Sequence, residues 1–263
     1  MKRTAQSITA VAITALLLPL IGCGDDAEEQ QAETRVEHLV SAAPYPSLEI
    51  HTDWVEDRRF RDGVDDRLVD GLEEVVDKPD GVHVVEGDEL PAEAPQEGWS
   101  FDELRQLVES RANAADVSDG AIDAYTLFVD GEYADGSGEG TVLGIAWSNR
   151  YSVLFQDSIE DACQSRLGAV PGLGDRLCEN AELVIWRHEI GHVLGLVNRG
   201  APLTSDHQDP EADAHCVHDD CVMYRAFRRP GALDVLADRM GDDRSTPDFD
   251  QACQDDLEAA RAE

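Results

Sequence analysis

The segment that decides the fold is WRHEIGHVLGLVNRGAP, residues 186–202. His188 and His192 lie four residues apart, so on a helix both imidazoles point from one face and can bind one metal ion. Two histidines are costly inside a buried helix unless they have partners. The flanking residues predict such a buried helix over about 180–197, because most of them are apolar: Val184, Ile185, Trp186, Ile190, Val193 and Leu194. The segment therefore predicts a metal site on a buried helix.

Glu189 follows the first of these histidines directly. Imidazole suits zinc, and a catalytic zinc site uses three protein ligands and leaves its fourth position to water. Glu189 could take a proton from that water as it attacks a carbonyl carbon, and then pass the proton to the leaving amine. The pattern predicts one catalytic Zn²⁺ ion and an enzyme that hydrolyses peptide bonds by metal-activated water.

Two further features carry a family resemblance. Gly195 lies three residues after His192 and permits a sharp turn there. Met223 follows His192 by 31 residues, within Cys221-Val222-Met223-Tyr224. Together with His188-Glu189-x-x-His192-x-x-Gly195, this segment resembles the metzincin clan of zinc endopeptidases, with its matrixins and archaemetzincins. The resemblance implies that Met223 lies in a methionine turn, as an apolar floor under the zinc histidines. Tyr224, the next residue, has either a structural role or a part in stabilising the oxyanion of the tetrahedral intermediate.

The resemblance covers about residues 45–225, although its motifs occupy only 188–224. It implies an α+β zincin with a twisted mixed sheet, two helices, an active-site helix and a small C-terminal subdomain. In that clan an edge strand lines the cleft, and extended substrate adds to it as another strand. The segments 141–149 and 151–157 are both candidates for this edge.

The third zinc ligand departs from the family pattern, which has a histidine where this chain has Asn198. A neutral amide is a poor zinc ligand beside imidazole, so the third ligand is expected further along the chain. His215 precedes Met223 by eight residues, as the third ligand does in matrixin-like chains, and we favour it. His207 is the rival, with Asp206 or Asp209 available to orient its ring.

Other outcomes stay open at this position. His218 could be the third ligand, or there could be none. A glutamate ligand of the gluzincin type would have to be Glu211, but its surroundings contain a proline and have no helical period. The stretch from Asn198 to His215 is interpreted as an insertion.

The N-terminus has the features of an export signal. Lys2 and Arg3 precede an apolar run over 8–21 that is too short to span a membrane. Leu20-Ile21-Gly22-Cys23 resembles the bacterial lipoprotein signal, which is cleaved before a cysteine that becomes lipid-modified; a plain secretory signal is the alternative. We expect a lipid-anchored protein outside the cytosol, at the outer membrane or cell surface.

An extracytoplasmic location makes disulfides plausible. Proximity in the sequence suggests the pairs Cys163–Cys178 and Cys216–Cys221, which leaves Cys253 without a partner. The second pair would fix His215 close to the site.

The predicted organisation is a signal peptide (1–22), an acidic flexible tether (23–43) and a protease domain (44–263) that divides at 197/198. Strands are expected at 47–55, 81–87, 122–131, 141–149 and 151–157. Helices are expected at 64–78, from Ser100 with a capping box to Glu103, and in the tail at 231–240 and 248–262. A loop over 163–178 is expected before the motif helix.

Composition limits the partners. The 263 residues include 21 basic and 56 acidic side chains, a formal net charge of −35. This charge argues against nucleic acid and anionic lipid surfaces. We expect a monomer that contacts the membrane only through its anchor and takes a peptide or protein substrate. The alternative function is a non-catalytic zinc-binding surface lipoprotein, which would not need Glu189.

Overall fold

The computed structural model describes residues 35–134, 141–166, 173–229, 231–241 and 246–262. One mixed sheet has the strand order β2-β1-β3-β5-β4. Four strands are parallel, and β4 runs antiparallel to β5 at one edge. The strands are β1 (Ser47–Val55), β2 (Val82–Leu90), β3 (Ala121–Val129), β4 (Gly144–Trp147) and β5 (Tyr151–Phe155). This sheet confirms the predicted α+β class.

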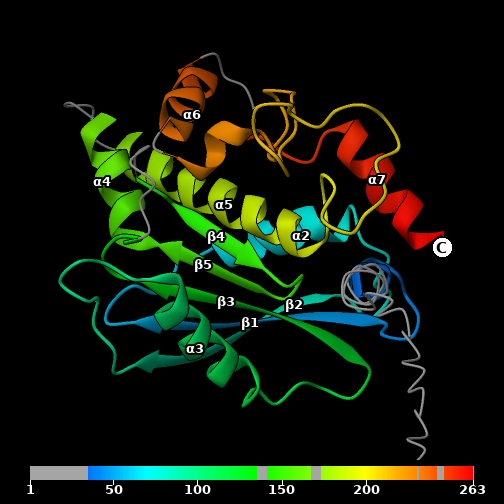
Figure 1. Cartoon of the computed structure of the whole chain (residues 1–263), viewed down its shortest axis with the longest axis horizontal. Helices are drawn as coiled ribbons and strands as arrows, with labels where there is room; N and C mark the ends of the chain where they lie inside the picture. The colour runs from blue at the N-terminus through cyan, green and yellow to red at the C-terminus, as the bar shows by residue number, and fades with distance from the viewer. Residues whose placement is uncertain (1–34, 135–140, 167–172, 230, 242–245, 263) are drawn as a thin grey trace, which may run out of the picture.

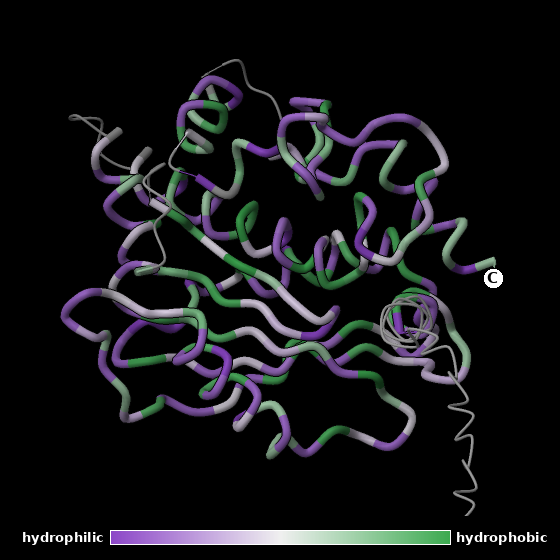
Figure 2. Tube along the Cα trace, viewed as in Figure 1, coloured by the Kyte–Doolittle hydropathy of each residue, from purple (hydrophilic) through white to green (hydrophobic). Residues whose placement is uncertain are grey.

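Helices cover both faces of the sheet (Figure 1). One face packs on α3 (Phe101–Ala112), and the other carries α2 (Val64–Glu73), α4 (Gln156–Arg166) and α5 (Leu173–Val193). The central strand β3 is buried along its whole length. Its alternate residues face opposite layers, as the strand period requires: Ile122, Ala124 and Phe128 toward α5, and Tyr125, Leu127 and Val129 toward α3. Figure 2 shows hydrophobic positions along the central strands and along α5.

Several predicted elements are confirmed. The opening β1-α2-β2 unit is present with β1 and β2 parallel, and α2 ends at Glu73, earlier than 78. Ser100 caps α3, with its side chain accepting from the Glu103 amide and the Glu103 carboxylate accepting in return. Of the two candidate edge strands, β4 is the edge.

The expected loop over 163–178 is wrong at both ends. Helix α4 continues to Arg166, and α5 begins at Leu173, well before the predicted start near 180. Cys163 and Cys178 are therefore helical residues on two packed helices. Both are buried, and they face the core between α4 and α5 rather than bounding an exposed loop.

The predicted tether is also wrong in its last part. Residues 35–40 are helical and bury three apolar side chains completely: Val36, Leu39 and Val40. The buried ammonium of Lys78 donates to the carbonyls of His38, Ser41 and Tyr45 at 2.6, 2.7 and 2.7 Å. The folded domain therefore includes residues before 44. The signal peptide, Cys23 and the first part of the tether lie outside the described residues.

The helix at 35–40 packs on the end of α5. Gly195 has φ +82°, and a Cβ there would lie 2.5 Å from Val36 Cγ2 and 2.9 Å from the Ala201 nitrogen. Glycine is required at this turn both by its backbone angle and by the close approach of its neighbours. The sharp turn predicted after the motif helix is present.

The chain after α5 forms an irregular segment, a 3₁₀ helix η1 (Arg225–Arg228), α6 (Ala232–Gly241) and α7 (Gln251–Arg261). These elements lie over α5 on the side away from the sheet (Figure 1). Within the described part of the chain, no helix is both long and apolar enough to cross a membrane.

Candidate metal centre

Buried contacts fix the position of α5. The Trp186 indole donates to Thr126 Oγ1 on β3 at 3.0 Å. The Glu182 carboxylate, with no exposed area, accepts from the backbone nitrogen of Arg61 at 2.8 Å and from its guanidinium at 2.6 Å. Arg187 donates to Asp248 at 2.8 Å, which ties the helix to the C-terminal region. The motif residues of α5 therefore sit on a rigid support.

Three imidazoles meet at the end of this helix. His188 and His192 come from α5, and His215 comes from the irregular segment; one ring nitrogen from each lies within 4.8 Å of the others. The ring centroids are 4.8 Å apart for His188 and His192, and 5.2 Å apart for each of these with His215. We call these residues the histidine group. Three imidazoles from a buried site are a donor set that fits catalytic zinc.

Backbone carbonyls orient two of the rings. The Nδ1–H of His188 donates to the Val222 carbonyl at 2.7 Å, and that of His215 to the Asp213 carbonyl at 2.7 Å. Because a carbonyl oxygen only accepts, Nδ1 must carry the proton and Nε2 keeps its lone pair. This tautomer is the one that metal-ligating histidines adopt.

The Glu189 side chain lies against the edge strand. It is 1% exposed, and a Cβ placed on Gly144 of β4 would lie 2.6 Å from its Oε1. The carboxylate is therefore between the histidine-bearing helix and the strand at the open edge of the sheet. A carboxylate that follows His188 in the chain and lies at this edge could serve as the general base for an attacking water.

Met223 packs beneath the same helix. It is fully buried, and a Cβ on Gly191 would lie 2.2 Å from its sulfur. The Met223 carbonyl accepts from the Cys216 amide at 2.9 Å, which joins the methionine turn to the segment that carries His215. Tyr224 is half-buried with its ring near Phe227, so its part in oxyanion stabilisation stays a prediction.

The other candidate ligands lie elsewhere. Asn198 is exposed, with φ +64°. His207 is buried, but its Nε2 contacts Asp256 at 2.7 Å and its Nδ1 contacts Cys216 Sγ at 3.4 Å. Its carboxylate partner is Asp256, not Asp206 or Asp209. Glu211 is exposed and paired with Arg225 at 2.9 Å.

The predicted disulfides are not formed, and all five described cysteines are free thiols. Cys163 and Cys178 are joined by a hydrogen bond, which raises the pKa of the Cys163 thiol. Cys216 and Cys221 lie close together, but Cys253 lies beside them as well. The sulfurs of Cys221 and Cys253 are 3.4 Å apart.

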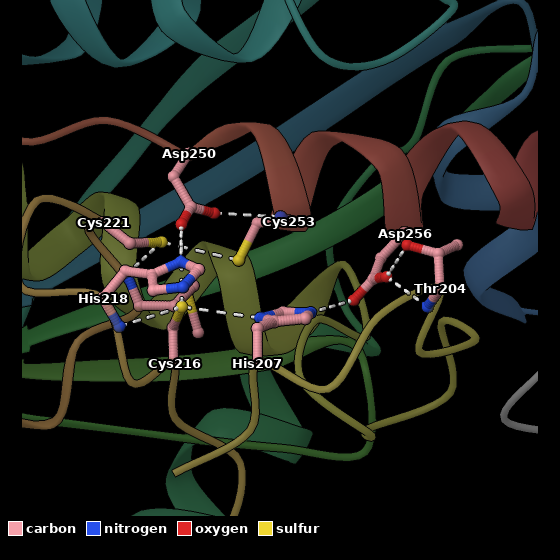
Figure 3. A network of polar contacts seen from close by, with 9 residues as sticks. Thr204, His207, Cys216, His218, Cys221, Asp250, Cys253 and Asp256 are labelled. Atoms are coloured by element: carbon pink, nitrogen blue, oxygen red, sulfur yellow. Dashed lines mark hydrogen bonds and ion pairs between the residues drawn. The ribbon is translucent and has the colours of Figure 1, made fainter.

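Four residues form a second possible metal group, which we call the thiol group: Cys216, Cys221, Asp250 and Cys253, with ligand atoms within 4.8 Å of one another (Figure 3). Backbone amides donate to two of the sulfurs, from His218 to Cys216 at 3.5 Å and from Met223 to Cys221 at 3.4 Å. Hydrogen bonds with Cys221 and Cys253 lower the pKa of Cys216. Thiolates with one carboxylate are a donor set that fits structural zinc.

Sequence reasoning missed Asp250 and Cys253 as members of this group. The sequence feature that could have indicated them is their spacing, Asp-x-x-Cys. In the first turn of α7, residues three apart lie on the same side of the helix. His218, considered as a third ligand above, contacts Asp250 at 2.5 Å and is half-exposed.

Two solved structures resemble this fold. Archaemetzincin from Methanopyrus kandleri aligns with a TM-score of 0.54 and 17% identity, over 83% of this chain and 97% of its own. A zinc-dependent peptidase from Methanocorpusculum labreanum aligns with a TM-score of 0.50 and 18% identity, over 79% of this chain and 99% of its own. At this identity the likeness concerns the fold. No protein-family model and no curated protein matches the sequence.

Proposed function

We propose that the protein is a zinc-dependent metalloendopeptidase whose ligands are His188, His192 and His215. One observation carries the proposal: a compact group of three imidazoles, two of them on the helix that also carries Glu189, whose carboxylate lies against the edge strand β4. The two solved structures of similar fold are an archaemetzincin and a zinc-dependent peptidase, which supports the same chemistry.

When bound, zinc would polarise the peptide carbonyl and lower the pKa of water to about 7. The chain's own residues supply the rest. Strand β4 has an open edge to which an extended peptide can add. Glu189 would accept a proton from the attacking water and donate it to the leaving amine. Met223 packs against Gly191 of the ligand helix and helps to keep the helix in place.

The Glu189→Gln variant tests this role. It keeps the size of the side chain but removes the base, so we expect hydrolysis to fall by about 10²–10⁴-fold. Zinc content should stay unchanged, because Glu189 is not a ligand. Glu179→Gln makes the same change in charge on the same helix, away from the site, and should retain full activity. Activity is measured on a panel of unfolded proteins, and zinc by elemental analysis.

The non-catalytic alternative makes the opposite prediction. If the chain only binds zinc for adhesion or partner binding, wild type and Glu189→Gln should behave alike on every substrate. The presence of a buried carboxylate at this position favours the enzyme, since metal binding alone does not require it.

Zinc analysis of two further variants tests the third ligand. His215→Ala should lose the zinc of the histidine group, whereas His207→Ala should retain it, since His207 contacts Asp256 and Cys216 instead. Retention of that zinc in His215→Ala would overturn the assignment.

We also propose export as a monomeric lipoprotein anchored through Cys23. The sequence around Cys23 supports this, and the five described cysteines are all buried and so unsuited to an anchor. Labelling of wild type, but not of Cys23→Ala, by radioactive fatty acid in cells is the expected result. A released wild-type protein without lipid would contradict the proposal.

A further inference from the structure

The turn between β4 and β5 lies against the end of the ligand helix α5. Asn149 belongs to this turn, and its side-chain amide donates to the Arg199 carbonyl at 2.9 Å. The same amide lies 3.3 Å from the Val193 carbonyl and 3.4 Å from the His192 carbonyl. We propose that Asn149 is a positioning residue, which fixes the edge strand β4 relative to the metal ligand His192 and so aligns a bound peptide with the metal. The inference rests on the proposed function.

The end of α5 needs donors from outside the helix. The last carbonyls of a helix lack partners in its own ladder. Helix α5 ends at Val193, and the chain then turns at Gly195, whose amide donates to the His192 carbonyl at 3.1 Å. The Asn149 amide can donate two hydrogen bonds, and it directs them to this end. Asn149 therefore caps the helix end that carries His192.

The turn itself is held in place on its other side. Ser148 and Asn149 have φ of +56° and +47°, a region that asparagine adopts more readily than most residues. The Asn149 carbonyl accepts from Arg35 Nε at 2.8 Å, and Arg35 Nη2 donates to the Asp123 carbonyl at 2.6 Å. The helix at 35–40 thus fastens the turn to β3, and the Asn149 side chain stays at the end of α5.

Two contacts fix β4 along α5, one at each end of the strand (Figure 1). Gly144 begins β4, and a Cβ there would lie 2.6 Å from Glu189 Oε1. Asn149 follows Trp147, the last residue of β4, by two positions and holds the end of α5 at His192. A peptide that adds to β4 takes its position from the backbone of that strand. Its scissile carbonyl therefore meets the metal only while β4 keeps this place on α5.

Two variants remove the amide, and a third is the matched control. Asn149→Gly leaves the backbone of the turn unstrained, because glycine adopts positive φ freely. Asn149→Asp keeps the size of the side chain but replaces both donors by a carboxylate oxygen, which repels the carbonyls. Ser148→Gly is the control, since Ser148 is exposed in the same turn and also has positive φ. The full chain is used throughout, with zinc content and Tm measured for each variant.

Two hydroxamates separate alignment from metal binding. Acetohydroxamate chelates the metal and is too small to extend along β4. A hexapeptide that ends in a hydroxamate can contact the metal and the strand at once. Its sequence is that of the residues before a bond that wild type cleaves in the panel of unfolded proteins. Calorimetric titration gives the Kd of both probes, and only the longer probe depends on the distance between β4 and the metal.

In Asn149→Gly the Kd of the peptide hydroxamate should rise by about 10- to 100-fold, the range found when residues that orient a metal ligand are altered. The kcat for peptide hydrolysis should fall by a similar factor. The Kd of acetohydroxamate and the zinc content should stay as in wild type. Asn149→Asp should behave as Asn149→Gly does, and Ser148→Gly should match wild type in every measurement.

Equal weakening of both probes would mean that Asn149 supports the metal site as a whole and does not align the strand. Unchanged binding of both probes would mean that it has no part in the site. Either result overturns the inference and leaves the proposed function intact, whatever the change in Tm. A wild type that cleaves no protein of the panel would instead refute the proposed function.

Discussion

The position of the Glu189 carboxylate depends on the absence of a side chain at Gly144. A Cβ there would lie 2.6 Å from Oε1, 2.7 Å from Cγ and 2.9 Å from Cδ. In Gly144→Ala the carboxylate must therefore move away from β4. A displacement of about 1 Å in a catalytic group can cost about 100-fold in rate, so we expect a loss of that order in kcat with zinc content unchanged.

Gly231→Ala is the control for this variant, because a Cβ there has no neighbour within 4 Å. It should keep full activity. Wild-type kcat in Gly144→Ala would mean that the carboxylate does not need its observed position. A parallel loss of thermal stability and zinc would indicate a structural effect on the whole site.

Gly191, on the ligand helix itself, similarly leaves room for the Met223 side chain beneath that helix. A Cβ there would lie 2.2 Å from Met223 Sδ and 3.0 Å from Phe249. Overpacking of a core typically costs about 1–3 kcal/mol, so Gly191→Ala should lower the free energy of unfolding by that amount in urea titrations. In Gly191→Ala with Met223→Ala the clash is removed, and the two effects should be non-additive. Simple additivity would show that the contact carries no strain.

Residue spacing selected two of the three histidines that the structure brings together, and the family resemblance favoured the third over His207. The four-residue interval put His188 and His192 on one helical face, and the distance to Met223 favoured His215. Asp250 and Cys253 were not predictable in the same way, because packing of α7 against the segment around Cys216 depends on the tertiary fold. The predicted Cys216–Cys221 disulfide failed for the same reason, because a third sulfur, that of Cys253, meets these two at one place.

At the scale of elements, the strands were predictable because their apolar residues are buried on one or both faces of a sheet. The helix at residues 35–40 was not predictable from the sequence. Val36, Leu39 and Val40 have helical spacing, but the helix is short and follows an acidic, polar stretch. Its stability comes from burial against the end of α5, which no local signal reveals.

Lys78 holds this N-terminal helix and gives it a pH dependence. Burial lowers the pKa of Lys78 to about 8, from an ordinary value of 10.5. Between these values the unfolded chain binds a proton that the folded chain has lost, so the free energy of unfolding rises with pH there, by at most about 1.4 kcal/mol per pH unit. Urea titrations at pH 8, 9 and 10 should show this increase.

Lys78→Met isolates the contribution of the lysine. The variant leaves three backbone carbonyls without their donor, so it should be less stable at pH 7. It should also lack the part of the rise between pH 8 and 10 that comes from Lys78. Parallel pH curves for wild type and Lys78→Met would contradict the lowered pKa.

For the whole molecule, the charge of −35 should make salt stabilising. With 56 acidic and 21 basic side chains, ion pairs cannot neutralise most of the carboxylates. Their repulsion opposes the compact state, and salt screens it, because the Debye length falls from about 30 Å at 0.01 M to about 10 Å at 0.1 M. We expect the unfolding temperature to rise over this interval; an effect on the order of 1 kcal/mol corresponds to about 2–4 °C. Sodium and potassium chloride should act alike. A fall with salt would mean that half-buried ion pairs such as Arg61–Glu182 and Arg111–Asp53 outweigh the net repulsion.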